Sequence, residues 1–337
     1  MKPLWHILRA CRQPRPGFVL ALLTGLFLWA CLDDVPRDNP LDPALGNHNF
    51  LLNGTVQTYY APRSPIADAL VWLEPGTHIT RTAADGAFRI ENIAAGLYTV
   101  YCSAEGYASD SVQVNLTANK QLNFNLNGLP RFVSRTVTTH HVARWFPLDD
   151  VYYLETAAQV TDADGLADIK QVICEIPYSA FRDTLDPELN AGHFKKTFFT
   201  QDLNISSLHE LLGQPVYFIA EDNPGAQLRT EGVYAARILE KTAALTSPVE
   251  LQAVPADSIH FRWELNPPAF DHTLQIDVYA INAGIVTSVK TIDDIPAGST
   301  DWLYRSDLPA GDYFWTVTIR DAFGNTSQSK EQVFQIQ

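Results

Sequence analysis

The sequence is poor in residues that carry chemistry. It contains four cysteines and one methionine among 337 residues, and charged residues make up only 18% of the chain. The motifs His-Glu-x-x-His, Cys-x-x-Cys and Gly-x-Ser-x-Gly do not occur, and neither does a phosphate-binding glycine loop. We therefore predict no catalytic residue, no cofactor and no enzymatic activity.

Positive charge is also scarce. Lysine and arginine number 24 against 38 acidic residues, which gives a formal net charge of −14. The charges of the first thirty residues are Lys2, Arg9, Arg12 and Arg15, so the remaining chain carries −18. Because nucleic acids are bound by clustered basic residues, and no basic stripe remains, we exclude nucleic acid as a partner.

The cysteines do not resemble a disulfide framework. Cys11 and Cys31 lie near the N-terminus, and Cys102 and Cys174 each alternate with apolar neighbours along a β-like run. We expect Cys102 and Cys174 to be small buried core residues, with a bridge between them as the weaker alternative.

One apolar run is long enough to suggest a membrane role. Residues 17–30 are apolar and follow the basic residues 2–15. The run is shorter than the roughly 20 residues that span a bilayer, so residues 1–30 are predicted to be an export signal helix.

The end of this run resembles the bacterial lipobox. Residues 28–31 read Leu-Trp-Ala-Cys, and the resemblance implies that Cys31 is lipidated and becomes the mature N-terminus. Because Trp29 is larger than usual at its position, inefficient cleavage or an uncleaved anchor remains the alternative. Leu32 replaces the aspartate that retains lipoproteins in the inner membrane, which favours the outer membrane of a Gram-negative bacterium.

Residues 31–50 form a predicted disordered tether. They are rich in Asp, Asn and Pro and have no apolar period. Residues 37–43, Arg-Asp-Asn-Pro-Leu-Asp-Pro, resemble the leader that follows the lipidated cysteine in lipoproteins of Bacteroidetes-like bacteria.

Residues 51–129 are predicted to form the first β-sandwich. Short runs alternate apolar and polar residues, and Asp85-Gly86 supplies a hairpin turn. The segment resembles the carboxypeptidase regulatory-like domain, which implies a non-catalytic transthyretin-like sandwich akin to carbohydrate-binding folds. The matching residues are Gly54, Val56, Pro65, Ala69, Val71, Asp85, Gly86, Phe88, Gly96, Tyr98, Gly106 and Tyr107.

Residues 130–240 are predicted to form a second all-β domain. Six strand-like runs occur, and residues 206–213 (SSLHELLG) predict one short helical turn that begins at a capping serine. The Asp-rich turn at residues 162–169 loosely resembles that of bacterial immunoglobulin-like domains.

Residues 241–337 resemble a fibronectin type III domain. Trp263 lies in an early strand, and Tyr313 follows Gly311 at the spacing of that family's tyrosine corner. Tyr313 and Trp315 are expected in the core, and Gly324-Asn325 forms the last hairpin turn. The predicted fold class is all-β, with tandem transthyretin-like, immunoglobulin-like and fibronectin type III-like sandwiches.

Two constellations could hold a metal ion. Asp162, Asp164 and Asp168 place three carboxylates within seven residues, as calcium sites require. The EF-hand pattern fails, however, because Ile173 stands at its twelfth position, so an ordinary Asp-Gly turn is the favoured interpretation. His140 and His141 are adjacent and would point to opposite faces of a strand, which disfavours a shared metal.

Trp72 and Tyr101 are candidate sugar-stacking residues. Strand alternation turns both away from the core, and an outward tryptophan is unusual. The simpler interpretation is that they pack against the neighbouring domain or the tether.

Three functions follow in order of preference. The first is a non-catalytic surface lipoprotein, structural or adhesive, whose sandwiches contact another protein or a cell-envelope component. The second is a glycan-binding lipoprotein that uses its first sandwich, and the third is an unrecognised hydrolase.

Overall fold

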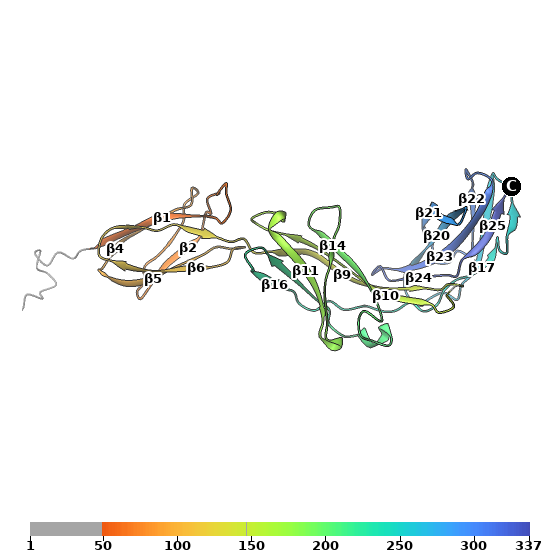
Figure 1. Cartoon of the computed structure of the whole chain (residues 1–337), viewed down its shortest axis with the longest axis horizontal. Helices are drawn as coiled ribbons and strands as arrows, with labels where there is room; N and C mark the ends of the chain where they lie inside the picture. Colours follow the sequence, from red (N-terminus) through yellow and green to blue (C-terminus); the bar gives the residue numbers. More distant parts are fainter. Residues whose placement is uncertain (1–48, 146) are drawn as a thin grey trace, which may run out of the picture.

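The molecule is a row of three β-sandwich units. The computed structural model describes residues 49–145 and 147–337, and in Figure 1 the N-terminal unit and the C-terminus lie at opposite ends of the row. Three separate hydrophobic clusters lie between residues 52–126, 137–235 and 239–336. The predicted fold class of tandem all-β sandwiches is confirmed, and within the described ranges no helix is long and apolar enough to cross a membrane.

The N-terminal unit consists of two sheets around one core. Its strands are β1 (Phe50–Thr58), β2 (Leu70–Glu74), β3 (Ile79–Arg81), β4 (Ala87–Ile93), β5 (Gly96–Ser103), β6 (Asp110–Leu116), β7 (Lys120–Gln121) and β8 (Phe124–Leu126). One sheet runs β3-β2-β5-β6, and β1 pairs with β4, β7 and β8 in the other. Val71, Leu73, Val100 and Cys102 are buried on alternate positions, as the apolar pattern predicts.

The turn at Asp85-Gly86 differs from the predicted hairpin. The turn itself forms, since Gly86 has φ +75° and an Asp85 carboxylate oxygen accepts the Ala87 N–H at 3.0 Å. However, β3 pairs with β2 and β4 pairs with β1, so the turn carries the chain from one sheet to the other. Local turn chemistry specifies the reversal and leaves the choice of strand partners to the core.

The middle unit also has two sheets. Its strands are β9 (Arg131–Val142), β10 (Val151–Thr161), β11 (Ile169–Ile176), β12 (Phe181–Thr184), β13 (Asp186–Pro187), β14 (His193–Phe199), β15 (Tyr217–Asp222) and β16 (Gln227–Arg229). Strands β13-β14-β10-β9 face β12-β11-β15-β16 across the core. Short 3-10 helices occur at η1 (Leu166–Asp168), η2 (Pro177–Ser179) and η3 (Leu208–Leu211).

The predicted helical turn is η3. Ser207 caps it, and the Glu210 carboxylate accepts a hydrogen bond from the Ser207 N–H, which completes a capping box. Its two leucines, Leu208 and Leu211, are buried in the core of the middle unit.

The C-terminal unit packs a three-stranded sheet, β17-β19-β22, against strands β21-β20-β23-β25. Its strands are β17 (Ala244–Ser247), β18 (Gln252–Val254), β19 (Ser258–Glu264), β20 (His272–Asn282), β21 (Ile285–Pro296), β22 (Asp301–Arg305), β23 (Gly311–Asp321), β24 (Thr326–Gln328) and β25 (Gln332–Ile336). Trp263 and Trp315 are buried in its core. The Tyr313 hydroxyl donates to the Pro309 carbonyl at 2.8 Å, which is the hydrogen bond of a tyrosine corner.

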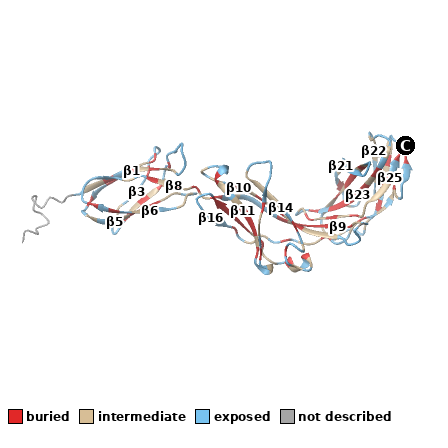
Figure 2. Cartoon of the chain, in the orientation of Figure 1, coloured by how far each residue is buried: buried red, intermediate tan, exposed pale blue. Residues whose placement is uncertain are grey.

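One sheet passes through both the middle and the C-terminal units. Strand β24 pairs in parallel with β9, with Thr326 opposite His140 and Gln328 opposite Val142. The result is a ten-stranded sheet whose main path runs β13-β14-β10-β9-β24-β23-β20-β21. Figure 2 shows buried residues along β9 and β23, so the two units are joined by a packed ladder.

Candidate functional site

The aromatic pair of the N-terminal unit lies outside the core, as predicted. Trp72 on β2 and Tyr101 on β5 are register partners and are both half-buried. Their rings stack with centroids 5.1 Å apart and planes inclined by 13°, and the Trp72 Nε1–H donates to Glu74 at 3.3 Å. Because each ring uses one face against the other, only the opposite faces remain for a ligand.

The two adjacent histidines point to opposite faces of β9, in the stretch where β9 pairs with β10 on one edge and with β24 on the other. His140 stacks on Tyr153 and hydrogen-bonds Thr138 and Thr326, while His141 stacks on Tyr152. Burial lowers the pKa of His140, which favours the neutral ring that both accepts and donates a hydrogen bond. These contacts fix the position of both rings at the boundary between the two units.

His141 belongs to a Ser-His-Asp chain that the sequence did not reveal. Its Nδ1 lies 3.0 Å from Ser327 Oγ, and its Nε2 lies 2.9 Å from Asp150 Oδ2. In serine hydrolases such a chain activates the hydroxyl, with the serine on Nε2 and the aspartate on Nδ1. Here the nitrogens are exchanged, and Ser327 is fully buried in the paired strand β24. The hydroxyl is therefore closed to a substrate, and the chain connects the two units.

Asn325 makes the second polar contact at this boundary. It is fully buried, its Oδ1 accepts the Thr139 N–H at 2.9 Å, and its Nδ2–H donates to Asp321 Oδ2 at 2.9 Å. Asp321 also lies 3.3 Å from the Arg237 guanidinium. The sequence predicted only a turn at Gly324-Asn325, because its partner Thr139 lies 186 positions earlier.

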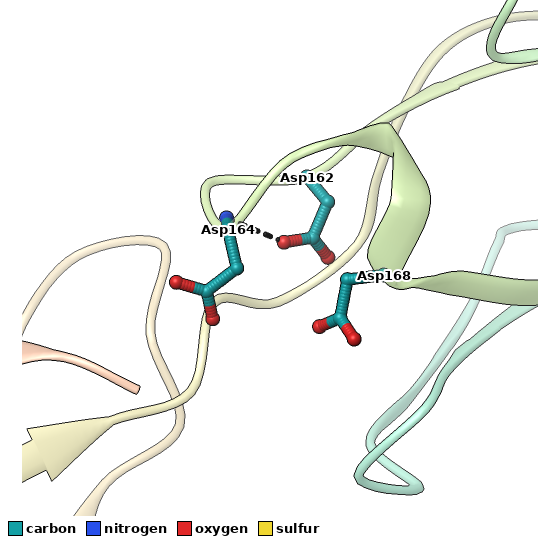
Figure 3. A group of neighbouring side chains, drawn as sticks. All are labelled: Asp162, Asp164 and Asp168. Carbon is teal, nitrogen blue, oxygen red and sulfur yellow. Dashed lines mark hydrogen bonds between the residues drawn. The ribbon is translucent and has the colours of Figure 1, made fainter. Parts of the chain in front are cut away.

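The three predicted aspartates meet where the N-terminal and middle units join. Each offers a carboxylate oxygen, and these ligand atoms lie within 4.8 Å of one another. Figure 3 shows the side chains of Asp162, Asp164 and Asp168 close together, with the Asp164 N–H hydrogen-bonded to the Asp162 carboxylate. Burial raises the pKa of Asp162, and the neighbouring carboxylates raise it further. The hydrogen bond from the Asp164 N–H lowers this pKa, but by less than burial raises it.

The N-terminal unit contributes further groups to this junction. The Tyr60 hydroxyl donates to Asp168 Oδ1 at 2.7 Å, which raises the pKa of Tyr60 to about 12. The Gly128 N–H donates to Asp164 Oδ2 at 2.6 Å, and the Asn127 Nδ2–H donates to Asp222 Oδ2 at 2.7 Å. The sequence did not indicate these partners, which lie 36 to 108 positions away along the chain.

The remaining site candidates are the cysteines. Cys102 and Cys174 are buried, free thiols, and burial raises the pKa of each to about 12. Their predicted place in the cores is confirmed, and such thiols are chemically inert. Cys31, the predicted lipidation site, lies outside the described residues.

Comparisons with known proteins agree with the modular organisation. Residues 52–127 match the family model of the carboxypeptidase regulatory-like domain, which confirms that predicted resemblance. No curated protein matches the chain.

Solved structures give only distant likenesses. The FN1–FN3 domains of chicken CNTN1 share 11% identity over 80% of this chain and 90% of theirs, with a TM-score of 0.29. The fibronectin(III)-like modules of Clostridium thermocellum CbhA share 11% sequence identity over 62% of this chain and 93% of theirs, with a TM-score of 0.28. The Bacillus anthracis TIE protein shares 11% sequence identity over 86% of this chain and 48% of its own, with a TM-score of 0.25. The three-unit architecture follows from the strand pairing and the three separate cores.

The substitution Ser327→Ala tests whether the Ser327–His141–Asp150 chain is structural or catalytic. We expect the free energy of unfolding to fall by about 1–2 kcal/mol, because His141 loses a hydrogen-bond partner in a site closed to water. We expect background hydrolysis of a p-nitrophenyl ester to be unchanged.

Calorimetry of the full chain and a colorimetric ester assay check both expectations. Ser288→Ala, at an exposed serine of β21, serves as the control and should change neither quantity. A loss of ester hydrolysis confined to Ser327→Ala would contradict the structural role.

Proposed function

We propose that the protein is a non-catalytic surface lipoprotein, held to the outer membrane by lipid on Cys31, that binds another protein or a cell-envelope component. The observation that supports this most strongly is the sheet shared by the middle and C-terminal units. A hydrogen-bonded ladder with buried side chains on both faces resists bending far better than a flexible linker does. The last two units therefore act as one stiff arm.

The arrangement of the units gives this arm a direction. The N-terminal unit and the C-terminus are at opposite ends of the row in Figure 1, and Cys31 precedes the N-terminal unit in the sequence. A lipid on Cys31 places the C-terminal unit farthest from the membrane.

The C-terminal unit offers an edge to which a partner could bind. Strand β21 ends the path of the ten-stranded sheet, and it exposes Ile285, Val286 and Val289. An edge strand presents unpaired N–H and C=O groups, and exposed aliphatic side chains beside them favour the addition of a partner's strand or loop.

A second candidate function is glycan binding by the N-terminal unit. It is favoured by the half-buried Trp72–Tyr101 pair, because flat aromatic rings stack on the apolar face of a pyranose. Residues 52–127, which match the carboxypeptidase regulatory-like domain, carry this pair. The resemblance to that family implies a sandwich akin to carbohydrate-binding folds.

Cys31→Ser tests the anchor. We expect the variant to carry no added lipid and to show no globomycin-sensitive processing, because serine has no sulfur to acylate. Intact mass of the wild-type protein should show the added lipid, and globomycin should block its processing. Cys11→Ser is the matched control and should carry the lipid and be processed like the wild type, whereas wild-type protein with an unmodified sulfur would contradict the anchor.

A photo-crosslinking amino acid at Val286 tests the direction of binding. In intact cells we expect one discrete adduct with a cell-envelope protein from this position, because it lies on the open edge of the outermost unit. Leu97, which is 58% exposed against 54% for Val286, is the matched control in the N-terminal unit. Equal adducts from both positions, or none from Val286, would count against the proposal.

Trp72→Ala tests the second candidate. If the aromatic pair binds glycans, the wild-type protein is retarded on a polysaccharide affinity gel and Trp72→Ala migrates freely, since the stacking face is lost. Trp145→Ala, at an exposed tryptophan of the middle unit, is the control and should be retarded like the wild type. Free migration of the wild type on every polysaccharide would rule the glycan function out.

A further inference from the structure

The junction of the N-terminal and middle units contains a group of buried oxygens without partners. Among the described residues, seven buried side-chain N or O atoms make no hydrogen bond, and four of them lie here. They are Asp162 Oδ2, Asp164 Oδ1, Asp168 Oδ2 and Asn127 Oδ1. Buried acceptors are normally paired, so a group of four points to something they are built to bind.

The partner of each carboxylate oxygen explains its orientation. Asp162 Oδ1 accepts the Asp164 N–H at 2.8 Å, Asp164 Oδ2 accepts the Gly128 N–H, and Asp168 Oδ1 accepts the Tyr60 hydroxyl. In all three carboxylates, one oxygen is fixed by a hydrogen bond and the other is left free. Asp168 is only 4% exposed, so its free oxygen has no access to bulk water.

Asn127 is oriented in the same way by a fourth carboxylate. Asp222 is fully buried, and its Oδ1 accepts the Gly225 and Ala226 N–H groups. Its Oδ2 accepts the Asn127 Nδ2–H, which leaves the amide oxygen of Asn127 unpaired beside the Gly128 contact to Asp164.

The charge of the junction requires compensation. Four aspartates gather here, two of them almost or fully buried, and within the described part of the chain none is paired with a lysine or arginine. Like charges at such distances repel strongly away from water, and burying them is costly without a counter-charge. A bound cation supplies it.

We propose that a calcium ion binds at this junction, coordinated by Asp162, Asp164 and Asp168 of the middle unit and by the amide oxygen of Asn127 of the N-terminal unit. All four donors are oxygens, which hard cations prefer, and the set contains neither the histidine nor the cysteine favoured by zinc. Calcium accepts irregular sets of six to eight oxygens, so water completes the shell. Magnesium demands a stricter octahedron and fits an irregular set of this kind less well.

Gly128 permits the close approach of the two units. A Cβ atom at this position would lie 2.8 Å from Asp162 Oδ1 and 2.9 Å from the Asp164 nitrogen. Because the ligands come from both sides, the ion joins the N-terminal unit to the middle unit. Calcium thereby controls how firmly the arm is attached to the lipid-proximal unit.

Calorimetric titration of the full-length chain in detergent, after removal of metal with a chelator, tests the site. We expect one Ca²⁺ per chain and a weaker interaction with Mg²⁺. Asp168→Asn should lower the calcium affinity at least tenfold, because it places an N–H donor or a neutral oxygen where the free carboxylate oxygen lies. Asp186→Asn, at an exposed aspartate of β13, is the control and should bind like the wild type. No heat with millimolar CaCl₂, or equal affinity for Mg²⁺, would overturn the proposal.

Asn127→Ala tests the contribution of the N-terminal unit. We expect a several-fold loss of calcium affinity, whereas Asn125→Ala, two residues earlier on β8, should have no effect. Unchanged affinity in Asn127→Ala would overturn the bridging of the two units.

Terbium provides a readout on the unmodified chain, should a variant fail to fold. The Tyr60 phenol contacts Asp168, so bound Tb³⁺ should give tyrosine-sensitised emission that Ca²⁺ displaces. Absence of sensitised emission from the wild-type protein would overturn the site.

Discussion

The parallel pairing of β9 with β24 is the contact on which the shape of the molecule depends. Only three residue pairs form the ladder, yet His140 and His141 within it and Thr139 directly before it are among the buried polar residues of the protein. Successive residues of a strand point to opposite faces, so three consecutive buried residues mean that both faces are covered. Each polar side chain in this stretch has a specific partner across the boundary, and a shifted register would leave these groups unpaired in a dry environment.

The two junctions of the chain are built on different principles. Between the middle and C-terminal units, hydrogen bonds and the Arg237–Asp321 ion pair satisfy the buried groups within the protein itself. Between the N-terminal and middle units, aspartates accumulate and several of their oxygens stay without a protein partner. The buried polar groups of the first junction have partners within the protein, whereas the free oxygens of the second require a cation from solution.

Sequence reasoning predicted the features that local patterns encode. Alternation placed Val71, Val100 and Cys102 in the core, because burial on one face of a strand repeats every second residue. Capping chemistry placed η3, and the spacing around Tyr313 placed a tyrosine corner. At Asp85-Gly86 the turn was predicted, but the strands that it joins were assigned wrongly to one sheet. Turn chemistry does not determine which sheet each strand enters.

The sites were less accessible to such reasoning. Three aspartates within seven residues suggested a metal. Asn127, Tyr60 and Asp222 come from distant segments, so only the folded structure shows that they join these aspartates at one junction. The contacts that Ser327, His141 and Asn325 make were not predicted, since they cross a boundary between segments 186 residues apart that no local pattern records.

The shared sheet also has a consequence for how the chain reaches its final form. Strand β9 leaves the ribosome 186 residues before its partner β24, so its edge stays open while most of the remaining chain is made. Pairings across such long sequence separations form slowly, and an open edge attracts strands of other molecules meanwhile. The polar end of β9, with Thr138, Thr139 and two histidines, disfavours such mistaken association until the last segment arrives.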